Sequence, residues 1–332
     1  MAKHRVLIVG VGSIGERHLR CFTVTGRAQT AICEVNTTLR EKVAKQYNVG
    51  QAYSNLEAAL EDVHDVAVVC TPAHLHVAMT TQLAEAGINV LCEKPLSTSM
   101  DGVEQMLHTI AQRDLTAAVG YTWRCNPVVA DSRQAIASGR FGQPLQIVMV
   151  QGSPFDYHRP AYREIYYNDH ATGGGCIQDG MTHIVNMGEW LVGPIDRLIA
   201  DCAHQHLEGV VVEDTVHVIT RQGNVLGNYS LNQYQPNDEM IINVVCEKAS
   251  LKILPRECCW QWKQHPEDAW QEKTFNKIER DTPYVTQANY FLDAVEGKGK
   301  VTCTLEEGIQ TLRVNLAMLT STRQQAWQTL DR

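Results

Sequence analysis

A glycine fingerprint near the N-terminus constrains the fold of this chain more than any other feature. The apolar run Val6–Val9 has the length of a buried strand and leads into Gly10-Val11-Gly12-Ser13-Ile14-Gly15. In a strand–turn–helix unit, the first glycine allows the tight turn, the second lets a pyrophosphate approach the backbone, and the third lets helix and strand pack closely. The N-terminus of the helix then offers N–H groups and a positive dipole end to the phosphates. The pattern therefore predicts a dinucleotide-binding loop, with these cofactor-binding residues: Gly10, Gly12, Ser13, Ile14 and Gly15.

Strand and helix patterns alternate over the first third of the chain. Residues 66–70 form a continuous apolar run, as expected for a strand that is covered on both faces, and residues 88–92 are predicted as another buried strand. Helical patterns follow them at residues 73–85 and 99–113. This alternation predicts an α/β fold with a doubly wound parallel sheet, a Rossmann domain, over residues 1–122.

Two helix starts in this region have the Ser/Thr-x-x-Glu spacing of a capping box. They are Thr38 with Glu41, and Ser54 with Glu57. In a capping box the first side chain bonds the backbone N–H of the fourth residue, whose own side chain reaches back. We therefore expect one helix through Tyr47 and a short helix around residues 56–60.

The pattern changes after residue 122, where we place the start of a second domain, residues 123–332. Strand-like segments recur, separated by turn residues, at 197–207, 211–221, 224–234, 240–246 and 249–254. They predict a meandering antiparallel sheet. Helical patterns accompany them at 126–138, from the glycine triplet 173–175 to about 191, at 285–295 and at 304–330.

Composition argues against several classes of function. The 332 residues carry a formal net charge of −8 without a basic stripe, which disfavours nucleic acid as a partner. No apolar stretch reaches the roughly 18 residues that span a bilayer. The first strand begins too early for a signal peptide, so we expect a cytoplasmic protein.

Metal binding is not predicted. The 11 cysteines include no Cys-x-x-Cys pair, and we expect them to be reduced and mostly buried. His74 with His76, and His204 with His206, lack a third ligand at a suitable spacing.

Glu34 follows the second predicted strand, 19 positions after Gly15. A carboxylate there can accept hydrogen bonds from both hydroxyls of the adenosine ribose and would repel a 2′-phosphate. Glu34 therefore predicts NAD rather than NADP as the cofactor. Arg40 lies near enough in sequence to pair with a 2′-phosphate, which keeps NADP as the alternative.

Two loops follow neighbouring predicted strands. One contains Thr71-Pro72-Ala73-His74-Leu75-His76, and the other contains Glu93-Lys94-Pro95. Ligands of an open parallel sheet bind outside the carboxyl ends of its strands, so both loops are expected on the cofactor side. Lys94 could there polarise a carbonyl or alkoxide oxygen, or ease the deprotonation of a hydroxyl. The alternative is an ordinary surface lysine.

Asp179 and His183 are four residues apart on a predicted helix and therefore share one face. Histidine is the side chain best suited to exchange a proton near neutral pH, and a neighbouring carboxylate would orient it and stabilise its charged form. A surface ion pair with no catalytic role is the alternative.

These motifs together resemble the Gfo/Idh/MocA family, the relatives of glucose–fructose oxidoreductase and inositol dehydrogenase. The matching motifs are Gly10-x-Gly12-x-x-Gly15, Thr71-Pro72 with His76, Glu93-Lys94-Pro95, and Gly173-Gly174-Gly175 leading into Asp179-x-x-x-His183. The resemblance covers nearly the whole chain. It implies a Rossmann domain followed by an α+β domain whose open, mainly antiparallel sheet often forms dimer or tetramer contacts. It also implies hydride transfer between nicotinamide C4 and a carbinol carbon of a sugar, cyclitol or related polyol.

The resemblance also implies roles for single residues. Lys94, Asp179 and His183 take catalytic positions, with His183 as proton acceptor and the other two orienting the substrate. Some relatives assign the proton to the lysine or to a tyrosine instead. The residues expected near the nicotinamide, its ribose or the rest of the cofactor are Thr71, Pro72, His76, Glu93, Lys94 and Arg124. Ala73 departs from the family, which often has asparagine there.

Residues 153–169 are rich in tyrosine and arginine and precede the predicted catalytic helix. Tyr157, Arg159 and Arg163 could stack on a sugar or bind its hydroxyls, and two arginines would suit a carboxylate or phosphate. The same residue types are enriched at interfaces, so a contact between domains or subunits is the alternative.

The leading functional prediction is an NAD-dependent sugar or polyol dehydrogenase. A glycosidase that oxidises its substrate transiently with bound NAD would need the same fold and similar residues. A non-catalytic sensor of dinucleotides is the third possibility. Net NADH production separates the first function from the other two.

Overall fold

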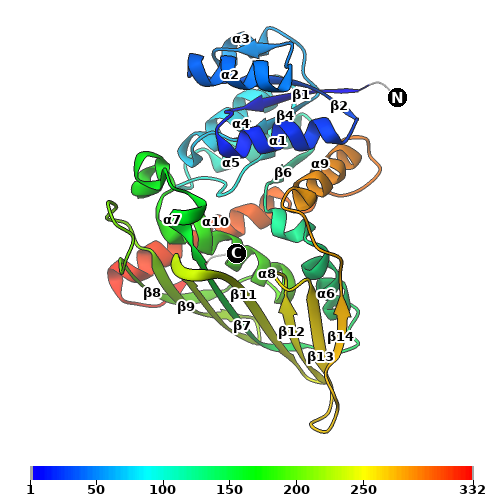
Figure 1. The fold of residues 1–332 in the computed structure, drawn as a ribbon, viewed down its shortest axis with the longest axis vertical. Helices are drawn as coiled ribbons and strands as arrows, with labels where there is room; N and C mark the ends of the chain where they lie inside the picture. Colours follow the sequence, from blue (N-terminus) through cyan, green and yellow to red (C-terminus); the bar gives the residue numbers. More distant parts are fainter. Residues whose placement is uncertain (1–2, 331–332) are drawn as a thin grey trace. The chain divides into compact units, whose positions relative to one another are not determined.

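The computed structural model describes residues 3–330 (Figure 1). Within this range the chain forms two compact units. The first contains the residues up to Cys125 together with Arg280–Ile309, and the second contains Asn126–Glu279 together with the residues from Gln310 onward. The return of residues 280–309 to the first unit is not apparent from the sequence pattern, which suggests one contiguous division at 122 and 123.

The first unit is built on a parallel sheet with the strand order β3-β2-β1-β4-β5-β6. The strands are β1 His4–Val9, β2 Ala28–Cys33, β3 Ala52–Tyr53, β4 Val66–Val69, β5 Asn89–Cys92 and β6 Ala117–Val119. Neighbours pair in parallel throughout the described part of this sheet. The winding direction reverses between β1 and β4, and ligands of such sheets bind at the carboxyl ends of the strands at that point. The predicted Rossmann fold is confirmed.

The first unit also contains helices, of which α1 to α5 connect its strands and α9 comes from residues 280–309. They are α1 Ser13–Val24, α2 Thr37–Tyr47, α3 Leu56–Leu60, α4 His76–Glu85, α5 Val103–Gln112 and α9 Thr282–Val295, with 3₁₀ turns at Ala73–Leu75 and Thr122–Cys125. The predicted capping boxes are wrong. Asn36 caps α2 by accepting from the Leu39 N–H, and Asn55 caps α3 by accepting from the Ala58 N–H. Asparagine is as strong an N-cap as serine and stronger than threonine, so in each case the asparagine is preferred to its Thr38 or Ser54 neighbour.

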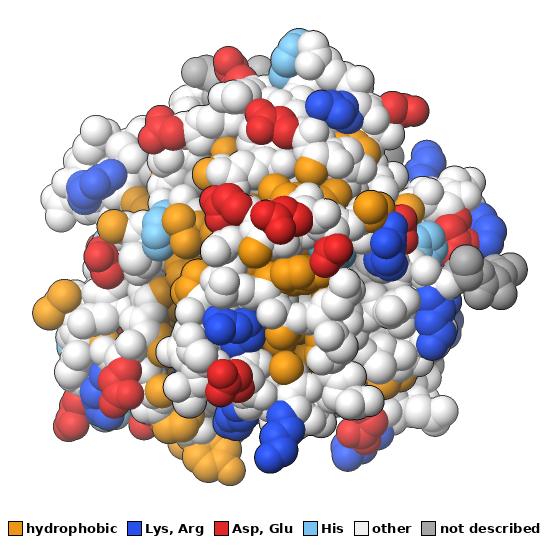
Figure 2. Space-filling model, turned by 90° about the horizontal axis from the view of Figure 1, so that it is seen from above, with side chains coloured by type: hydrophobic (Ala, Val, Ile, Leu, Met, Phe, Trp, Pro, Cys, Tyr) orange, Lys and Arg blue, Asp and Glu red, His pale blue; other side chains and the backbone are white. Residues whose placement is uncertain are grey.

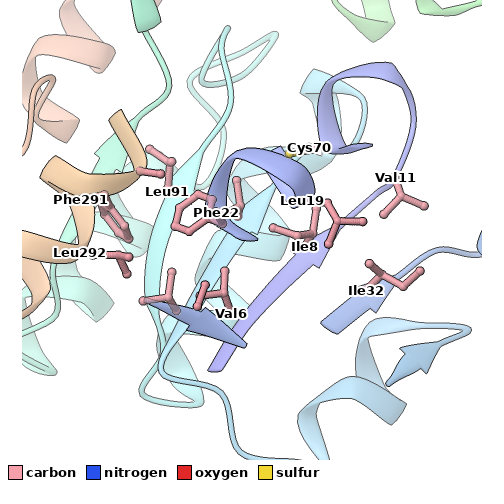
Figure 3. Close-up of a cluster of buried hydrophobic side chains, with 14 of the residues drawn as sticks. Val6, Ile8, Val11, Leu19, Phe22, Ile32, Cys70, Leu91, Phe291 and Leu292 are labelled. Atoms are coloured by element: carbon pink, nitrogen blue, oxygen red, sulfur yellow. The ribbon is translucent and has the colours of Figure 1, made fainter. Parts of the chain in front are cut away.

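An apolar core joins the sheet of the first unit to α1 and α9 (Figure 3). Ile8 of β1 and Phe22 of α1 belong to this core, as do Phe291 and Leu292 of α9, and all four are at most 1% exposed. Burying one such side chain contributes about 1.5–3 kcal/mol. Residues 280–309 therefore complete the core of the unit that begins the chain.

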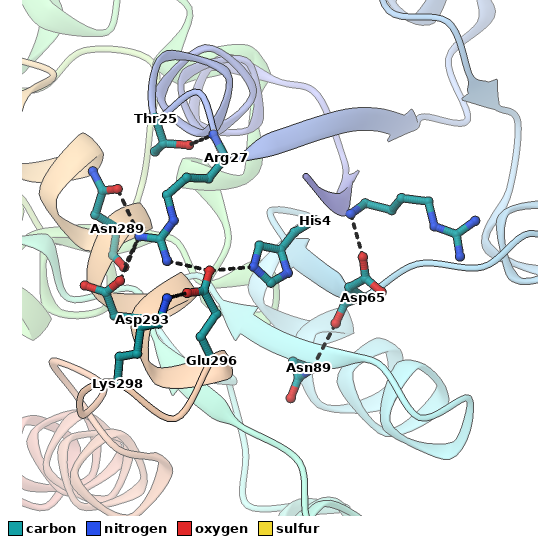
Figure 4. Close-up of polar contacts among 10 residues, drawn as sticks. His4, Thr25, Arg27, Asp65, Asn89, Asn289, Asp293, Glu296 and Lys298 are labelled. Carbon is teal, nitrogen blue, oxygen red and sulfur yellow. Dashed lines mark hydrogen bonds and ion pairs between the residues drawn. The ribbon is translucent and has the colours of Figure 1, made fainter. Parts of the chain in front are cut away.

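A polar network ties α9 to the start of the sheet (Figure 4). The carboxylate of Glu296 accepts from Arg27 Nη2 at 2.7 Å and lies 2.9 Å from His4 Nε2. Arg27 also pairs with Asp293 at 2.8 Å. The hydrogen bonds from Arg27, Lys298 and His4 hold the pKa of Glu296 well below its usual range.

The second unit contains a mixed, mainly antiparallel sheet with the order β14-β13-β12-β11-β7-β10-β9-β8-β15. The strands are β7 Pro144–Pro154, β8 Arg197–Ala203, β9 Thr215–Gln222, β10 Val225–Asn232, β11 Tyr234–Cys246, β12 Ala249–Leu254, β13 Cys259–Lys263, β14 Gln271–Thr274 and β15 Gln328–Thr329. The simple meander is wrong at one place, because β7 lies between β10 and β11 and runs parallel to β10.

Helices cover one face of this sheet. The longer helices of the second unit include α6 Pro127–Ala137 and α8 Thr182–Val192, and α10 Leu305–Gln324 contains the last boundary between the units. Helix α6 packs against β12 and β13, and α8 packs against β7 and β10; Figure 1 shows α6 and α8 on the same side of the sheet. Along β9, Val216 and Val218 are buried while His217 and Ile219 are exposed, so the opposite face of this strand is open. The last helix stops at Gln324 rather than continuing to residue 330, because β15 pairs with β8.

The surface carries charges of both signs. On the face drawn in Figure 2, lysine and arginine side chains are interspersed with aspartate and glutamate rather than gathered in one basic patch. Within residues 3–330, no helix is long and apolar enough to cross a membrane.

Candidate functional site

The fold requires glycine at two of the three fingerprint positions but not at the third. Gly10 has φ +82°, and a Cβ at Gly15 would lie 1.9 Å from the Gly10 carbonyl oxygen, so the fold itself requires both. Gly12 has an ordinary φ of −61°, and a Cβ there would meet no described atom within 4 Å. The fold therefore does not explain Gly12, whereas a pyrophosphate that approaches the backbone at this position does.

The first turn of α1 presents Ser13 but not Ile14 to the surface. Gly12 and Ser13 are exposed, while the half-buried Ile14 packs against the apolar core. The dipole of this 12-residue helix favours an anion at Ser13. Of the two predicted residues, Ser13 is the better placed to contact a phosphate.

Glu34 is fixed beside the glycine loop. One carboxylate oxygen accepts from the Val11 N–H at 3.0 Å, and the other accepts from the Asn36 N–H at 2.9 Å. Each oxygen keeps further acceptor capacity for a ribose hydroxyl. Arg40 donates from Nη1 to the Glu34 carbonyl at 2.7 Å, so its guanidinium lies close to Glu34.

The loop after β4 is joined to the loop after β5 by His76. Its Nε2 lies 2.7 Å from the Thr71 carbonyl oxygen, and its Nδ1 lies 2.9 Å from that of Pro95. The ring is 1% exposed, whereas Thr71 is half-buried and Pro72 is exposed. Burial lowers the pKa of His76, opposed by the two backbone contacts. His76 thus holds the two loops together, and Thr71 and Pro72 form the accessible part.

The loop after β5 carries Glu93 and Lys94, with a cis peptide bond between Lys94 and Pro95. Glu93 is 4% exposed, and its carboxylate lies 2.7 Å from His18 Nε2 and accepts from the Lys94 N–H at 3.0 Å. Lys94 itself is half-buried. Burial would raise the pKa of Glu93, but His18 and Lys94 hold it below its usual value.

His18, which contacts Glu93, is not among the predicted site residues. It lies three residues after Gly15 on α1, so it shares the helix face that packs toward the sheet. This spacing is the one signal in the sequence that pointed to it.

Arg124 is buried in the first unit. Its Nη1 donates to the Thr302 carbonyl at 3.1 Å and pairs with Glu307 at 2.6 Å. These contacts attach the end of the N-terminal segment to residues 280–309.

In the second unit, the glycine triplet allows close packing before the helical stretch that carries Asp179 and His183. A Cβ at Gly174 would lie 2.2 Å from the Tyr167 carbonyl oxygen, and one at Gly175 would lie 2.5 Å from the Glu213 carboxylate. Glu213 accepts from the Ile177 N–H at 2.9 Å and lies 2.6 Å from His170 Nε2. The triplet is therefore explained by packing rather than by a second phosphate loop.

Asp179 and His183 lie on one helical stretch. Asp179 belongs to a π-helical turn, Ile177–Met181, and His183 to the first turn of α8. Both are half-buried, although most of their neighbours are fully buried. Such π turns are frequent at functional sites. The stretch thus leaves two ionisable side chains accessible on an otherwise buried helix.

Tyr166 was not among the predicted site residues. Its hydroxyl donates to Asp179 Oδ1 at 2.7 Å, from a 3₁₀ turn at Tyr166–Asn168. The aromatic content of residues 153–169 was the only hint of it in the sequence.

The stretch around residues 153–169 is anchored within its own unit. Phe155, Tyr162 and Tyr167 form a core with Leu207, Val210 and Val212. Arg163 donates from Nε to the Glu208 carbonyl at 2.8 Å and stacks over Tyr162. Among the predicted substrate residues, Arg163 makes contacts within its own unit, Arg159 is half-buried and Tyr157 is 79% exposed.

Histidine pairs in the sequence have structural partners. His204 Nε2 lies 2.7 Å from the Leu207 carbonyl oxygen, and the N–H groups of His206 and Leu207 donate to Asp214. Across residues 3–330 there is no group of three or more His, Cys, Asp or Glu side chains that could hold a metal ion.

Two family profiles match this chain, one in each unit. A profile described as "Oxidoreductase family, NAD-binding Rossmann fold", of the GFO_IDH_MocA family, matches residues 4–121. A second, "GFO/IDH/MocA C-terminal domain", matches residues 129–252.

Named relatives are distant in sequence. Levoglucosan dehydrogenase from Pseudarthrobacter phenanthrenivorans is 25% identical over 214 residues, which cover 60% of this chain and 54% of that protein. The chain thus spans about half the length of this relative. Inositol 2-dehydrogenase from Corynebacterium glutamicum is 26% identical over 305 residues, which cover 88% of this chain and 85% of that protein.

Solved structures share the fold. A levoglucosan dehydrogenase in complex with NADH and levoglucosan has a TM-score of 0.91 at 19% identity, covering 99% of this chain and 100% of that chain. Together the two profiles cover most of the sequence and confirm the resemblance that its motifs carry: the chain belongs to the Gfo/Idh/MocA family of oxidoreductases.

Proposed function

We propose that this protein is an NAD-dependent oxidoreductase that acts on a carbinol carbon of a sugar, cyclitol or related polyol. Asp179 and His183 carry the proposal, because they stay accessible on a helical stretch whose other residues are mostly buried. Two distant relatives are named dehydrogenases of levoglucosan and of inositol, which supports a polyhydroxylated substrate.

The first unit fits a dinucleotide. Gly12 leaves room for a pyrophosphate, and Glu34 keeps acceptor capacity for the ribose hydroxyls. Gly10, Gly12, Ser13, Gly15, Glu34, Thr71 and Pro72 would hold the cofactor. Bound NAD supplies nicotinamide C4 as the hydride acceptor or donor. The negative charge of Glu34 favours NAD over NADP in this proposal.

His183 accepts the proton of the substrate hydroxyl, and Asp179 and Lys94 bind and orient the substrate. Asp179 is four residues before His183 and receives a hydrogen bond from Tyr166, which fixes its carboxylate. Lys94 brings a cationic group to the loop after β5 and favours an oxygen that becomes negative. A positioned general base contributes about 10²–10⁴-fold to the rate.

An NAD-linked screen against sugars, inositols, sugar acids and amino sugars tests the proposal. We expect NADH formation with at least one polyol, and a loss of about 10²–10⁴-fold in kcat for His183→Ala with NAD affinity retained. Full activity in His183→Ala would refute the role of His183. Hydrolysis of an aryl glycoside without net NADH would instead support a glycosidase, and NAD binding without any turnover would support a sensor.

Substitution of Arg159 and Arg163 tests whether the tyrosine- and arginine-rich stretch contacts substrate. Arg163 is bonded to the Glu208 carbonyl, so we expect Arg163→Ala to affect stability first. We expect Arg159→Ala to raise the KM for substrate and to leave the KM for NAD unchanged. If neither variant changes the substrate KM, the stretch does not contact substrate.

We further propose that the open face of the second sheet forms a homodimer or homotetramer. Ile219 of β9 and Leu226 of β10 are 49% and 42% exposed, and the half-buried Val148 and Val150 of β7 lie on the same face. Light scattering after size-exclusion chromatography should show a smaller particle for Ile219→Lys with Leu226→Lys. Val211→Lys is the control, since Val211 is 86% exposed outside the strands.

A further inference from the structure

A buried histidine, His18, contacts Glu93, the residue before Lys94 in the loop after β5. His18 of α1 is fully buried, and its Nε2 lies 2.7 Å from Glu93 Oε1. The other oxygen of Glu93 accepts from the Lys94 N–H at 3.0 Å. One carboxylate therefore connects the helix that follows the glycine loop to the backbone of Lys94.

The His18 ring has little freedom to move. The ring of Tyr284, from α9, meets it edge-on with centroids 5.5 Å apart, and Phe22 lies on the same helix at 6.3 Å. Tyr284 is itself covered by the guanidinium of Arg17 at 5.0 Å. Arg20 donates two hydrogen bonds, of 2.6 and 2.9 Å, to the carboxylate of Asp281, and these bonds fix the start of α9 against α1.

Gly120 also confines the Glu93 carboxylate. A Cβ at Gly120 would lie 2.9 Å from Glu93 Oε1, so the carboxylate fills the space beside β6. The Gly120 N–H donates to the Cys92 carbonyl at 2.7 Å, directly before Glu93. Gly120 and His18 together confine Oε1 of Glu93, and its Oε2 accepts from the Lys94 N–H, so the carboxylate links these groups in a fixed arrangement.

We propose that His18 is a positioning residue of the oxidoreductase: through Glu93 it fixes the backbone from which Lys94 reaches the substrate. This inference rests on the proposed function of Lys94. A buried carboxylate that loses its partner must recruit water or move, and either response releases the Lys94 N–H. Displacement of a catalytic group by about 1 Å can cost about 10²-fold in rate.

The test compares two substitutions of His18 with a matched histidine. His18→Leu removes the donor, while His18→Gln keeps an amide N–H near the position of Nε2. His64 is the control, because it is 6% exposed, bonds the Ala59 carbonyl at 3.0 Å and packs edge-on against Tyr53 as His18 does against Tyr284. Both histidines lie in the first unit, so general loss of packing affects His64→Leu too.

We expect His18→Leu to lower kcat by about 10- to 100-fold, with the KM for NAD changed far less. His18→Gln should restore most of the rate, and His64→Leu should lower thermal stability without lowering kcat. The proposal is overturned if folded His18→Leu keeps its kcat, or if His64→Leu loses as much. If His18→Leu does not fold, Gly120→Ala places a Cβ 2.9 Å from Oε1 of Glu93, displaces the carboxylate and must lower kcat in the same way.

A second measurement does not depend on turnover. Reductive methylation with ¹³C-formaldehyde gives each lysine an NMR signal, and Lys94→Arg identifies that of Lys94. His18→Leu should shift or broaden this signal, while His18→Gln and His64→Leu should leave it in place. An unchanged signal in His18→Leu refutes the inference. A changed signal in a protein that oxidises no polyol refutes the proposed function alone.

Discussion

Tyr166 donates a hydrogen bond to Asp179 across 2.7 Å, and so ties the 3₁₀ turn at 166–168 to the π turn that precedes His183. Tyr166→Phe removes this bond and leaves the ring. A hydrogen bond to a charged group contributes about 1.5–3 kcal/mol, and 1.4 kcal/mol corresponds to about tenfold. We therefore expect kcat/KM for the polyol to fall about tenfold, with the Kd for NAD unchanged.

Tyr234→Phe is the control for this substitution. Tyr234 is 36% exposed and Tyr166 is 37% exposed, and both belong to the second unit. Steady-state kinetics of Tyr166→Phe and Tyr234→Phe show whether loss of the Tyr166–Asp179 bond lowers kcat/KM. An equal effect of the two substitutions would show that the Tyr166–Asp179 bond has no special role.

Glu34 should set the cofactor preference through its charge. Glu34→Gln keeps the size of the side chain and one acceptor oxygen for the backbone, but removes the repulsion of a 2′-phosphate. The Arg40 guanidinium donates to the Glu34 carbonyl and so lies near enough to pair with a 2′-phosphate. We therefore expect the ratio of kcat/KM for NAD to that for NADP to fall about tenfold or more. Glu41→Gln, on the exposed side of α2, should leave the ratio unchanged. A wild-type preference for NADPH would contradict the assignment.

Gly12 and Gly15 should separate binding from folding. A methyl group at Gly12 meets no described atom within 4 Å, so Gly12→Ala should keep its Tm while the Kd for NAD rises about tenfold or more. Gly15→Ala places a Cβ 1.9 Å from the Gly10 carbonyl oxygen and should lower the Tm. Gly50→Ala, another site with open space, should change neither quantity. Thermal denaturation and calorimetric titration with NAD measure both effects.

His170 should make the stability of the second unit depend on pH. Its hydrogen bond to Glu213 raises the pKa of His170 above 6.5, against the effect of burial, and Asp169 adds to the rise while Arg323 opposes it. A raised pKa in the folded state means that the stabilisation is complete below about pH 6.5. It is lost as the pH rises through the higher folded value.

The measurement compares the Tm of the wild type with that of His170→Gln at pH 6 and at pH 9. We expect the wild type to be the more stable protein at the lower pH, and the difference to shrink at the higher pH. His217→Gln, at an exposed position on β9, should show no such trend. A difference that stays constant between the two pH values would exclude the His170–Glu213 pair as its source.

Much of the first unit follows from its sequence, because parallel strands covered on both faces leave continuous apolar runs. The runs at 66–70 and 88–92 became β4 and β5 almost residue for residue. Local capping was less predictable. Asn36 and Asn55 compete with adjacent threonine and serine, and the spacing to a following glutamate does not decide between them.

The second unit was harder to derive, since pairing between distant strands leaves no local signal. The alternating burial of β9 and β10 is visible in the sequence, but the insertion of β7 beside β10 is not. The same holds for the site. Asp179 and His183 are candidates by their spacing together with the family resemblance, whereas the contacts of His18 with Glu93 and of Tyr166 with Asp179 join residues 75 and 13 positions apart.

The return of residues 280–309 to the first unit has a consequence for biosynthesis. Phe291, Leu292 and Glu296 complete a core and a polar network that also contain Phe22, Arg27 and His4 from the first 27 residues. A ribosome delivers Phe22 and Arg27 long before it delivers these partners. The first unit therefore reaches its final form only after residues 280–309 have been translated, although its strands β1–β6 are all synthesised before β7.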